Sequence, residues 1–567
     1  MGLVALHLWI ARDVTSPGRG PGDQWGYLGS ARFLAGAPHA YVMPHFPYFT
    51  YGYSIVLAPL VRFIDDPWEL FRAIKVLNAA LAAATFPLLY VFGRRLLGAE
   101  RTPAMLAAAM GSLVWPLMFH PDAILAESLV IPLVVATLLA CWLFLTERPS
   151  WQRLLFAPSM VWLHVTHNRF AATLLLFFAL LLLVAMTRAV PRWLAAANAL
   201  VAVGLLVGAQ VLRDAIVEAR WVDGISTPQG PASDAVDVLR DGHLLGEYLL
   251  ASAGQVWYLA VTTLGLALIG VAVVAARVFA PEETAPAARA WRGLVDDPRR
   301  LTLAFLVGMA AAVFATSAYF FTRVVNGSEG YVAGRHNESF VAIWVSVGVL
   351  FLTPPTPLGR VRRALLGALA ASATASIVLF LGRRGDLSSI YSDLNVPGLA
   401  PFGTFGDVVP QRATWVAMAA IVLATVLTLV GVRPTVLLPL MALWVVVGTV
   451  NTVGSGDPSA GWEFADDLAE VPVTRAALIG GYQTGVPPYY QYYLPDIEMV
   501  PWDGDDVPPE PFVLARSDAG LESQGARIAA TDDTAQATFR APYTIALWVM
   551  PGPEQERLDA MGLLQPA

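Results

Sequence analysis

The sequence predicts a polytopic α-helical membrane protein that ends in a small α/β domain. Of its 567 residues, 56% are hydrophobic and only 14% are charged, and the mean hydropathy is +0.58. A transmembrane helix needs about 20 mostly apolar residues, and the chain offers roughly a dozen such stretches. This composition excludes soluble globular, disordered and fibrous proteins. Because Cys141 is the only cysteine, neither disulfides nor thiolate metal sites can hold the fold.

The apolar stretches predict about thirteen membrane-spanning helices. They cover residues 1–11, 72–93, 104–120, 125–145, 154–166, 169–187, 194–212, 251–279, 301–321, 337–354, 364–382, 413–431 and 434–453. The first stretch is short, because its residues rise only about 16 Å against a hydrocarbon core of about 30 Å. We therefore expect either a truncated start or a true first residue before Met1. A cleaved signal peptide is the alternative, although no basic region or small-residue cleavage site precedes Arg12.

Arginines in the short loops predict the orientation of these helices. They recur in alternate loops, and short loops rich in arginine face the cytoplasm. The residues concerned are Arg94, Arg95, Arg101, Arg148, Arg153, Arg188, Arg192, Arg289, Arg292, Arg299, Arg300, Arg360, Arg362, Arg363 and Arg433. The opposite loops, at 12–71, 214–250, 322–336 and 383–412, then lie outside a cytoplasmic membrane, together with the C-terminal domain.

Residues 1–453 are expected to form the membrane domain and residues 454–567 an extracytoplasmic α/β domain. The first outer loop, 12–71, contains two half-apolar segments, 25–34 and 51–63, which are too short to span and predict helices in the membrane interface. Beyond Gly454, β-type runs alternate with helical stretches. The predicted strands are 476–479, 497–500, 512–515, 526–529 and 545–550, and the predicted helices are 462–471, 488–493 and 554–563. A linker rich in glycine, serine and proline covers 451–461.

Charge is distributed unevenly between these two domains. From Gly454 onward there are 18 acidic residues and 5 arginines, whereas the first 453 residues carry 31 basic and 25 acidic residues. An acidic aqueous domain on a weakly basic membrane domain speaks against nucleic-acid binding, which needs a concentrated basic surface.

The first outer loop carries the first candidate site residues. Asp23 begins the first interfacial segment, where it is either a helix N-cap or a general base. A carboxylate at the mouth of a membrane cavity can stay ionised and accept a proton from an acceptor hydroxyl. Further along the loop, His45, Tyr48, Tyr51 and Tyr53 suit either sugar stacking or an interfacial aromatic belt.

The second candidate group lies in FHPDAILAESLVIPL, between the third and fourth predicted spans. Asp122 follows Pro121 in a short outer turn, where it either shapes the turn or contacts a substrate. Glu127 falls about one turn inside an otherwise apolar helix. An ionisable group at that depth is costly unless it faces a cavity or a partner, so we expect Glu127 to be functional.

The third candidate group lies in LHVTHNRFAATLL, at an outer membrane edge. His164 and His167 are three residues apart and could ligate a metal, but no carboxylate or cysteine stands nearby in the sequence. Arg169 either extends its head to the interface or holds a phosphate.

The fourth candidate group opens the tenth predicted span. Arg335 and His336 precede Glu338 at the membrane surface, where a lipid phosphate would lie. A guanidinium matches a phosphate bidentately, and the start of a helix adds a favourable dipole. The alternative for Arg335 is a structural salt bridge to Glu338.

In this order, the features resemble the GT-C glycosyltransferases, in the branch of the protein O-mannosyltransferases and the lipid A aminoarabinose transferase. The matching segments are GDQWGYLGSARFLAGAP, PYFTYGYSIVLAPLVRFI, LFRAIKVLNAALAAATFPLLYVFGRRLLG and MLAAAMGSLVWPLMFHPDAILAESLVIPL. They cover most of the first 190 residues, and the predicted topology agrees over the whole chain.

The resemblance implies an enzyme that transfers a sugar from a polyprenyl-phosphate donor to an extracytoplasmic glycan, lipid or protein, usually with inversion. It implies that Asp23 occupies the catalytic acidic position of the first loop and Glu127 the acidic position that opens the fourth span. Arg335 resembles the late arginine that holds the lipid phosphate. Gln24 stands where many relatives have a second acidic residue, so a divalent metal is possible rather than required.

Two other functional classes remain open on the sequence alone. A lipid or polysaccharide transporter could use a similar number of helices, although no internal repeat is visible and the acidic residues gather at one membrane face. A noncatalytic cell-envelope scaffold could bind a partner through its C-terminal domain. The sequence identifies neither the sugar nor the acceptor.

Overall fold

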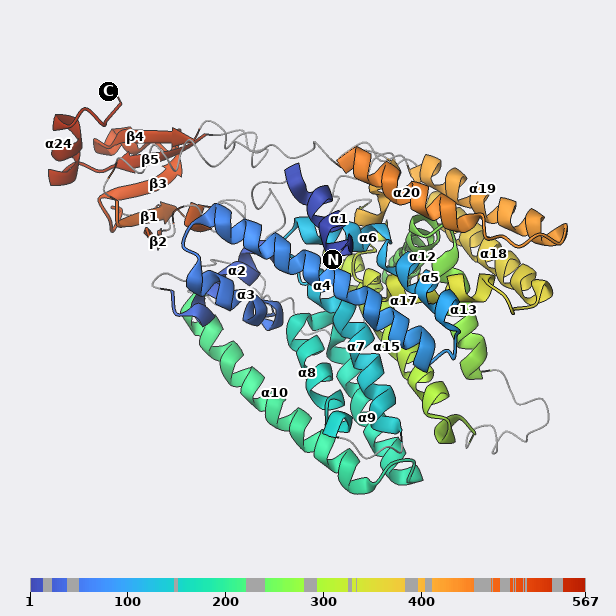
Figure 1. Ribbon diagram of the computed structural model, residues 1–567. Helices are drawn as coiled ribbons and strands as arrows, with labels where there is room; N and C mark the ends of the chain where they lie inside the picture. The colour runs from blue at the N-terminus through green and yellow to red at the C-terminus, as the bar shows by residue number, and fades with distance from the viewer. Residues whose placement is uncertain are drawn as a thin grey trace.

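The computed structural model in Figure 1 describes most of the chain. The described residues are 2–13, 23–37, 50–146, 151–220, 240–279, 293–324, 329–332, 334–382, 396–402, 410–452, 471, 473–479, 490–492, 494, 496–502, 504, 507–532 and 544–565. They form a helical body followed by a small sheet domain, which confirms the predicted fold class. The predicted boundary near 454 and most of the linker lie outside the described residues.

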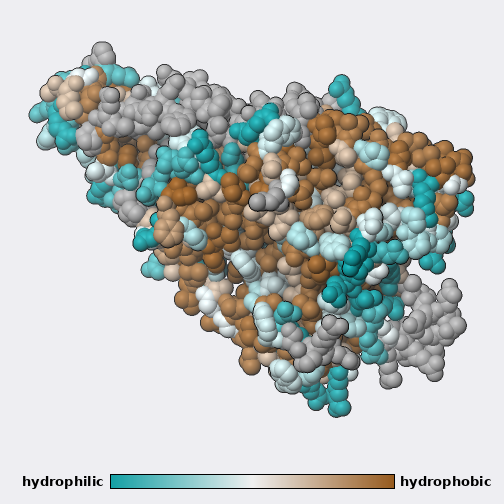
Figure 2. All heavy atoms as spheres, in the orientation of Figure 1, coloured by the Kyte–Doolittle hydropathy of each residue, from teal (hydrophilic) through white to brown (hydrophobic). Residues whose placement is uncertain are grey.

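Long helices make up the membrane domain. Seven described helices are long and apolar enough to cross a membrane, and a bent pair adds an eighth candidate. The single helices lie in α4 (Pro67–Arg95), α7 (Glu127–Leu145), η4 (Asn168–Phe170) continued by α9 (Ala171–Thr187), α10 (Arg192–Arg220), α15 (Pro298–Val324), α18 (Leu358–Gly382) and α19 (Pro410–Leu429). The bent pair is α12 (Gly242–Thr262) with α13 (Leu266–Phe279). Figure 2 shows apolar side chains gathered over much of this helical body.

Shorter helices connect and cover the long ones. The two predicted interfacial segments are α2 (Asp23–Ala35) and α3 (Gly52–Phe63). The others are α1 (Gly2–Ile10), η1 (Ala11–Asp13), α5 (Arg101–Ser112), α6 (Trp115–Phe119), η2 (His120–Asp122), η3 (Trp151–Leu154), α8 (Phe156–Thr166), η4 (Asn168–Phe170), α16 (Glu329–Val332), α17 (Glu338–Leu352), η5 (Pro397–Phe402) and α20 (Leu437–Thr452).

The described helices supply fewer full-length spans than the thirteen predicted, because five predicted spans contain only helices of fewer than 18 residues. These are 1–11, 104–120, 154–166, 337–354 and 434–453, and a sixth predicted span is bent. The predicted span 251–279 is bent by 111° between α12 and α13, where Leu264 and Gly265 have φ of 49° and 80° and so cannot continue a right-handed helix. The predicted span 104–120 breaks between α5 and α6, at a proline in the first turn of α6 that lacks the N–H a continuous helix would use. The predicted span 154–166 is the eleven-residue α8, too short to cross alone.

The C-terminal domain is built on one mixed sheet. Its strands are β1 (Arg475–Ile479), β2 (Glu498–Trp502), β3 (Phe512–Arg516), β4 (Arg527–Asp532) and β5 (Ile545–Val549), in the order β2-β1-β3-β5-β4. The first three strands are parallel, and β5 pairs antiparallel with β3 and β4. All five predicted strands are therefore found. The predicted helix 554–563 is α24 (Pro553–Ala560), η6 (Leu521–Gln524) precedes β4, and the predicted helix 462–471 lies almost wholly outside the described residues.

The sheet domain lies against the first outer-loop region of the membrane domain (Figure 1). The Tyr492 hydroxyl donates a hydrogen bond to the carbonyl of Pro67, at the start of α4. The Tyr492 ring lies 5.7 Å from the Trp25 ring of α2. Thus the C-terminal domain contacts the helix that begins with Asp23.

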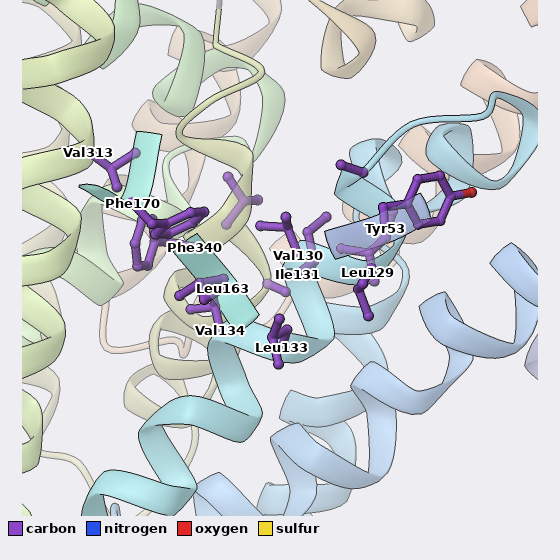
Figure 3. Close-up of a cluster of buried hydrophobic side chains, with 14 of the residues drawn as sticks. Tyr53, Leu129, Val130, Ile131, Leu133, Val134, Leu163, Phe170, Val313 and Phe340 are labelled. Atoms are coloured by element: carbon purple, nitrogen blue, oxygen red, sulfur yellow. The ribbon is translucent and has the colours of Figure 1, made fainter. Parts of the chain in front are cut away.

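Helix α7 runs through the apolar centre of the membrane domain. Its residues from Leu129 to Val134 lie between Tyr53 on one side and Phe170 and Phe340 on the other (Figure 3). The rings of Phe170 and Phe340 lie 6.3 Å apart, and both are fully or almost fully buried. Since Glu127 begins α7, this packing fixes the position of its carboxylate.

Candidate active site

Arg335 brings together two carboxylates from distant parts of the chain. Its Nη2 donates to Asp23 Oδ2 at 2.5 Å, and its Nε donates to Glu127 Oε1 at 2.9 Å. A third contact joins Nη2 to Glu127 Oε2 at 3.3 Å. Asp23 begins α2, Glu127 begins α7, and Arg335 lies between α16 and α17. The starts of α2 and α7 therefore converge on the guanidinium of Arg335.

Arg169 completes this group, which we name the acid–arginine cluster: Asp23, Glu127, Arg169 and Arg335. Arg169 Nη2 donates to Glu127 Oε1 at 2.6 Å, and its Nη1 donates to the carbonyl of Arg335 at 3.2 Å. Its buried Nε has no hydrogen-bond partner among the described residues. This N–H is consequently a donor that a ligand oxygen could use.

The cluster is electrically balanced, and its members differ in access to water. Two carboxylates face two guanidiniums. The side chain of Glu127 is fully buried and those of Arg169 and Arg335 are 1% and 6% exposed, whereas that of Asp23 is 22% exposed. Asp23 is thus the carboxylate that an incoming group can reach. Burial alone would lower the pKa of Arg335, but attraction to Glu127 and Asp23 outweighs it and raises that pKa above its ordinary value.

Two histidines flank the cluster in their neutral form. Burial, and then repulsion from Arg169, hold the pKa of both His167 and His336 well below the usual range. Their rings lie 5.5 Å apart. The Nδ1 of His167 accepts a hydrogen bond from the backbone N–H of Arg169 at 3.3 Å, so this histidine helps to shape the turn that carries Arg169.

Local backbone geometry explains how Arg335 is placed. The carbonyl of Gly334 accepts hydrogen bonds from the N–H groups of Asn337 and Glu338, which starts α17. A Cβ on Gly334 would lie 1.8 Å from the Tyr258 ring, so only glycine allows this approach. Asn337 also donates to Gln255 Oε1 at 2.6 Å.

Glu338 belongs to a second buried group. Its Oε2 lies 3.0 Å from His120 Nε2, and its Oε1 accepts a hydrogen bond from the Tyr258 hydroxyl. The same hydroxyl accepts a bond from the N–H of Gly398 at 2.8 Å. The alternative in which Arg335 pairs with Glu338 is therefore wrong: Arg335 turns to Asp23 and Glu127, while Glu338 is held by His120 and Tyr258.

The other predicted site residues either form hydrogen bonds away from the cluster or have side chains outside the described residues. Tyr51 does not join the cluster, because its hydroxyl donates to the carbonyl of Ala209 on α10, and Tyr53 likewise bonds to Asn78. Asp122 ends η2, but its side chain lies outside the described residues. His45 and Tyr48 also lie outside them.

Sequence reasoning missed several residues that support the cluster. Arg220, fully buried at the end of α10, donates to the carbonyl of Gly26 at 3.0 Å and to Ser30 Oγ at 2.6 Å. It thereby anchors α2, which carries Asp23. Tyr27 is buried close to the cluster, and burial followed by the charge of Asp23 raises its pKa well above its usual value. Only the position of Arg220 at the end of an apolar helix could have indicated its role.

A metal site was left open by the sequence. Within the described ranges, no group of three or more histidine, cysteine, aspartate or glutamate side chains could hold a metal ion. His164 and His167 do not form such a group, and Asp23 is already paired with Arg335.

Comparisons with known proteins give structural likeness only. No protein-family model and no curated protein matches the sequence. The chain is similar to the crystal structure of ArnT from Cupriavidus metallidurans in the apo state, with 13% identity, a TM-score of 0.48, and coverage of 97% of this chain and 98% of that one. ArnT bound to undecaprenyl phosphate gives 14% identity and the same score and coverage. The arabinosyltransferase EmbB from Mycobacterium smegmatis gives 15% identity and a TM-score of 0.44, covering 80% of this chain and 40% of EmbB.

Proposed function

We propose that this protein is a GT-C-type membrane glycosyltransferase, which transfers a sugar from a polyprenyl-phosphate donor to an acceptor hydroxyl outside the cytoplasmic membrane, with inversion. The observation that carries the proposal is the convergence of Asp23, Glu127 and two arginines in one group of ion pairs. Such a group combines a base with cations for a leaving phosphate, which is what displacement at an anomeric carbon requires.

Asp23 is the general base in this proposal. The acceptor oxygen attacks the anomeric carbon and gives its proton to Asp23, while the bond from that carbon to the phosphate oxygen breaks and its electron pair leaves with the phosphate. Asp23 is suited to this step because its side chain is the most exposed of the cluster. Glu127 is fully buried between Arg169 and Arg335, so it orients the two arginines instead.

Arg335 and Arg169 receive the leaving phosphate. A guanidinium can bind a phosphate with two parallel hydrogen bonds. Arg169 offers a buried Nε without a partner among the described residues, whereas Arg335 binds Asp23 at 2.5 Å. We infer that the donor phosphate takes the place of Asp23 on Arg335, which frees the carboxylate to act as a base only after the donor has bound.

The test is sugar transfer by the purified full-length protein with polyprenyl-phosphate sugars. Asp23→Asn keeps the size of the side chain and removes its basicity, so we expect transfer to fall by about a hundredfold or more. Asp65→Asn, at an exposed position of the same outer loop, is the control and should retain activity. Normal transfer by Asp23→Asn would reject the base assignment and favour a transporter or scaffold.

A further inference from the structure

A pocket rich in arginine lies where α9 turns into α10, away from the acid–arginine cluster. We name it the arginine pocket, and its volume is about 540 Å³. Its lining comes from Arg153 of η3 and from residues 188–193, which connect α9 to α10 and include Arg188, Arg192 and Trp193. The lining therefore carries three guanidiniums and no carboxylate.

The arginine pocket and the cluster lie at opposite ends of α7. Glu127 begins this helix, whereas Arg153 donates from Nε and Nη2 to the carbonyl of Phe144 near its end, at 3.0 and 2.8 Å. Glu127 and Phe144 are about 26 Å apart along the helix axis, close to the thickness of the hydrocarbon core. Figure 1 also shows the turn between α9 and α10 at the far end of α10 from α2. The pocket is therefore at the other membrane surface, which the arginine loops predict to be cytoplasmic.

Two of the three arginines have a structural role that leaves their charge in place. Arg153 donates to the carbonyl of Phe144, and Arg192 Nε donates to the carbonyl of Ala185, at 3.4 Å, in the last turn of α9. A carbonyl carries no net charge, so it satisfies an N–H without neutralising the guanidinium. Among the described residues, no carboxylate pairs with any of the three arginines. The pocket thus holds three positive charges that a bound anion could balance.

Arg188 is the arginine of the pocket that the fold does not explain. It ends α9 with φ of 60° and ψ of 24°, in the left-handed region. A Cβ is unfavourable in this conformation, and glycine is the usual residue where a helix ends in this way. The Arg188 side chain is exposed and has no hydrogen-bond partner among the described residues. Because the backbone favours glycine here, a long cationic side chain indicates a role outside the fold.

Exposed tryptophans indicate that the pocket faces a lipid interface. Trp193 lines the pocket and is 69% exposed, and Trp151, two residues before Arg153, is 71% exposed. Indole rings in such positions are typical of the boundary between lipid headgroups and hydrocarbon. Basic pockets between helices at the cytoplasmic surface suit anionic lipid headgroups.

We propose that the arginine pocket binds the headgroup of an anionic phospholipid from the adjoining membrane leaflet. The phosphodiester accepts hydrogen bonds from Arg188, whose guanidinium can present two parallel N–H groups to two phosphate oxygens. Arg153 and Arg192 add attraction through their charge, and the Trp193 ring lies against the first carbons of the lipid. This site is independent of the proposed glycosyl transfer, because it lies at the opposite membrane surface from the cluster.

The experiment titrates purified full-length protein in detergent with phosphatidylglycerol or phosphatidylcholine, and uses inorganic phosphate as a competitor. The parent protein should bind phosphatidylglycerol more tightly than phosphatidylcholine. Arg188→Gly and Arg188→Gln should each weaken phosphatidylglycerol binding about tenfold, the worth of one charge-assisted contact, and leave phosphatidylcholine binding unchanged. Arg188→Gly also relieves the backbone, so its thermal midpoint without lipid should equal or exceed that of the parent. Arg362→Gln, at an exposed arginine of α18 outside the pocket, is the control and should bind like the parent.

Four outcomes would overturn this assignment. Unchanged phosphatidylglycerol binding by both Arg188 variants would exclude the pocket, and equal binding of the two lipids by the parent would exclude a site that recognises charge. Full competition by inorganic phosphate would identify a free-anion site instead of a lipid site. An equal loss of binding in Arg362→Gln would show that overall surface charge attracts the lipid. A lower thermal midpoint of lipid-free Arg188→Gly would fit the opposite view, in which Arg188 serves the fold, and would remove the argument for a ligand.

Discussion

Asp23 and Glu127 contact the same guanidinium, but the difference in their burial gives them different chemistry. Removing either arginine partner of the fully buried Glu127 would strongly destabilise the folded protein, because it would leave an uncompensated buried charge. Asp23 has one described arginine contact and partial access to water. It can therefore exchange partners, and this exchange can be measured without turnover.

Asp23→Asn should bind the donor lipid more tightly than the parent protein, although it transfers almost no sugar. The substitution removes the anion that competes with the donor phosphate for Arg335. We expect a severalfold decrease in the Kd for undecaprenyl phosphate, corresponding to about 1 kcal/mol. Direct binding measurements on purified protein test this, with Asp65→Asn as the charge-matched control. Weaker binding by Asp23→Asn would show that Asp23 assists the donor instead of competing with it.

Neutral His167 and His336 predict a loss of stability in mild acid. Their folded pKa values are lowered, so the unfolded chain binds more protons, and stability falls as pH drops below about 6.5, the ordinary pKa of histidine. Each histidine contributes up to about 1.4 kcal/mol per pH unit. The thermal midpoint of the protein should therefore decrease from pH 7 to pH 5.5, and less steeply in His336→Asn. An equal slope in that variant would show that other groups govern the acid response.

At the residue scale, the sequence identified the four members of the cluster for distinct reasons. Glu127 stood out because its charge lies inside an apolar helix, and Arg169 and Arg335 because they precede spans. Their mutual contacts could not be predicted, since Asp23 and Arg335 are separated by 312 positions. Arg220 went unnoticed because its position at the end of an apolar helix, the one available signal, does not show that α2 packs against it.

At the scale of the secondary-structure elements, short and broken helices position the cluster. The sequence predicted these elements less well than it predicted the individual site residues. Tyr258 lies in the last turn of α12, before the bend to α13, and contacts Gly334 and Glu338. A run of apolar residues in the sequence does not reveal a bend such as the one between α12 and α13, or a short turn such as η4. The residues on the two sides of the bend are equally hydrophobic, so the hydropathy pattern does not change there. The five strands were easier to predict, since short β-type runs are bounded by glycine and proline.

Gly334→Ala should reduce transfer strongly without abolishing membrane insertion. The new Cβ would overlap the Tyr258 ring at 1.8 Å, so either the ring or the backbone that carries Arg335 must move. A displacement of about 1 Å at a catalytic group can cost about a hundredfold in rate. Gly208→Ala on α10, where nothing lies within 4 Å of the new Cβ, is the control. Parental activity in Gly334→Ala would show that the segment before α17 tolerates movement.

At the scale of the whole molecule, the proposed function places the cluster and the C-terminal domain on the same side of the membrane. The contact between Tyr492 and Trp25 places the sheet domain beside α2. The arginine loops predict that this side is extracytoplasmic. The buried Cys141 leaves the protein without an exposed native thiol to disturb a labelling test.

An impermeant thiol reagent applied to intact cells should label Ser523→Cys and leave Thr102→Cys unlabelled. Both positions are exposed, one before β4 and the other at the start of α5 in an arginine-rich loop. Thr102→Cys should react once the membrane is permeabilised. Labelling of Thr102→Cys with protection of Ser523→Cys would invert the topology and place the cluster in the cytoplasm.

The C-terminal domain contacts the helix that carries Asp23 through Tyr492. Tyr492 packs against Trp25, two residues from Asp23, and its hydroxyl bonds to Pro67. Tyr492→Ala removes both contacts and should lower kcat several-fold by loosening α2, while the Kd for undecaprenyl phosphate stays near the parent value because the arginines are untouched. Tyr492→Phe keeps the ring and should retain more activity than Tyr492→Ala. If Tyr492→Ala turns over like the parent, the sheet domain does not position the base; if it loses lipid binding as well, its effect is a general loss of structure.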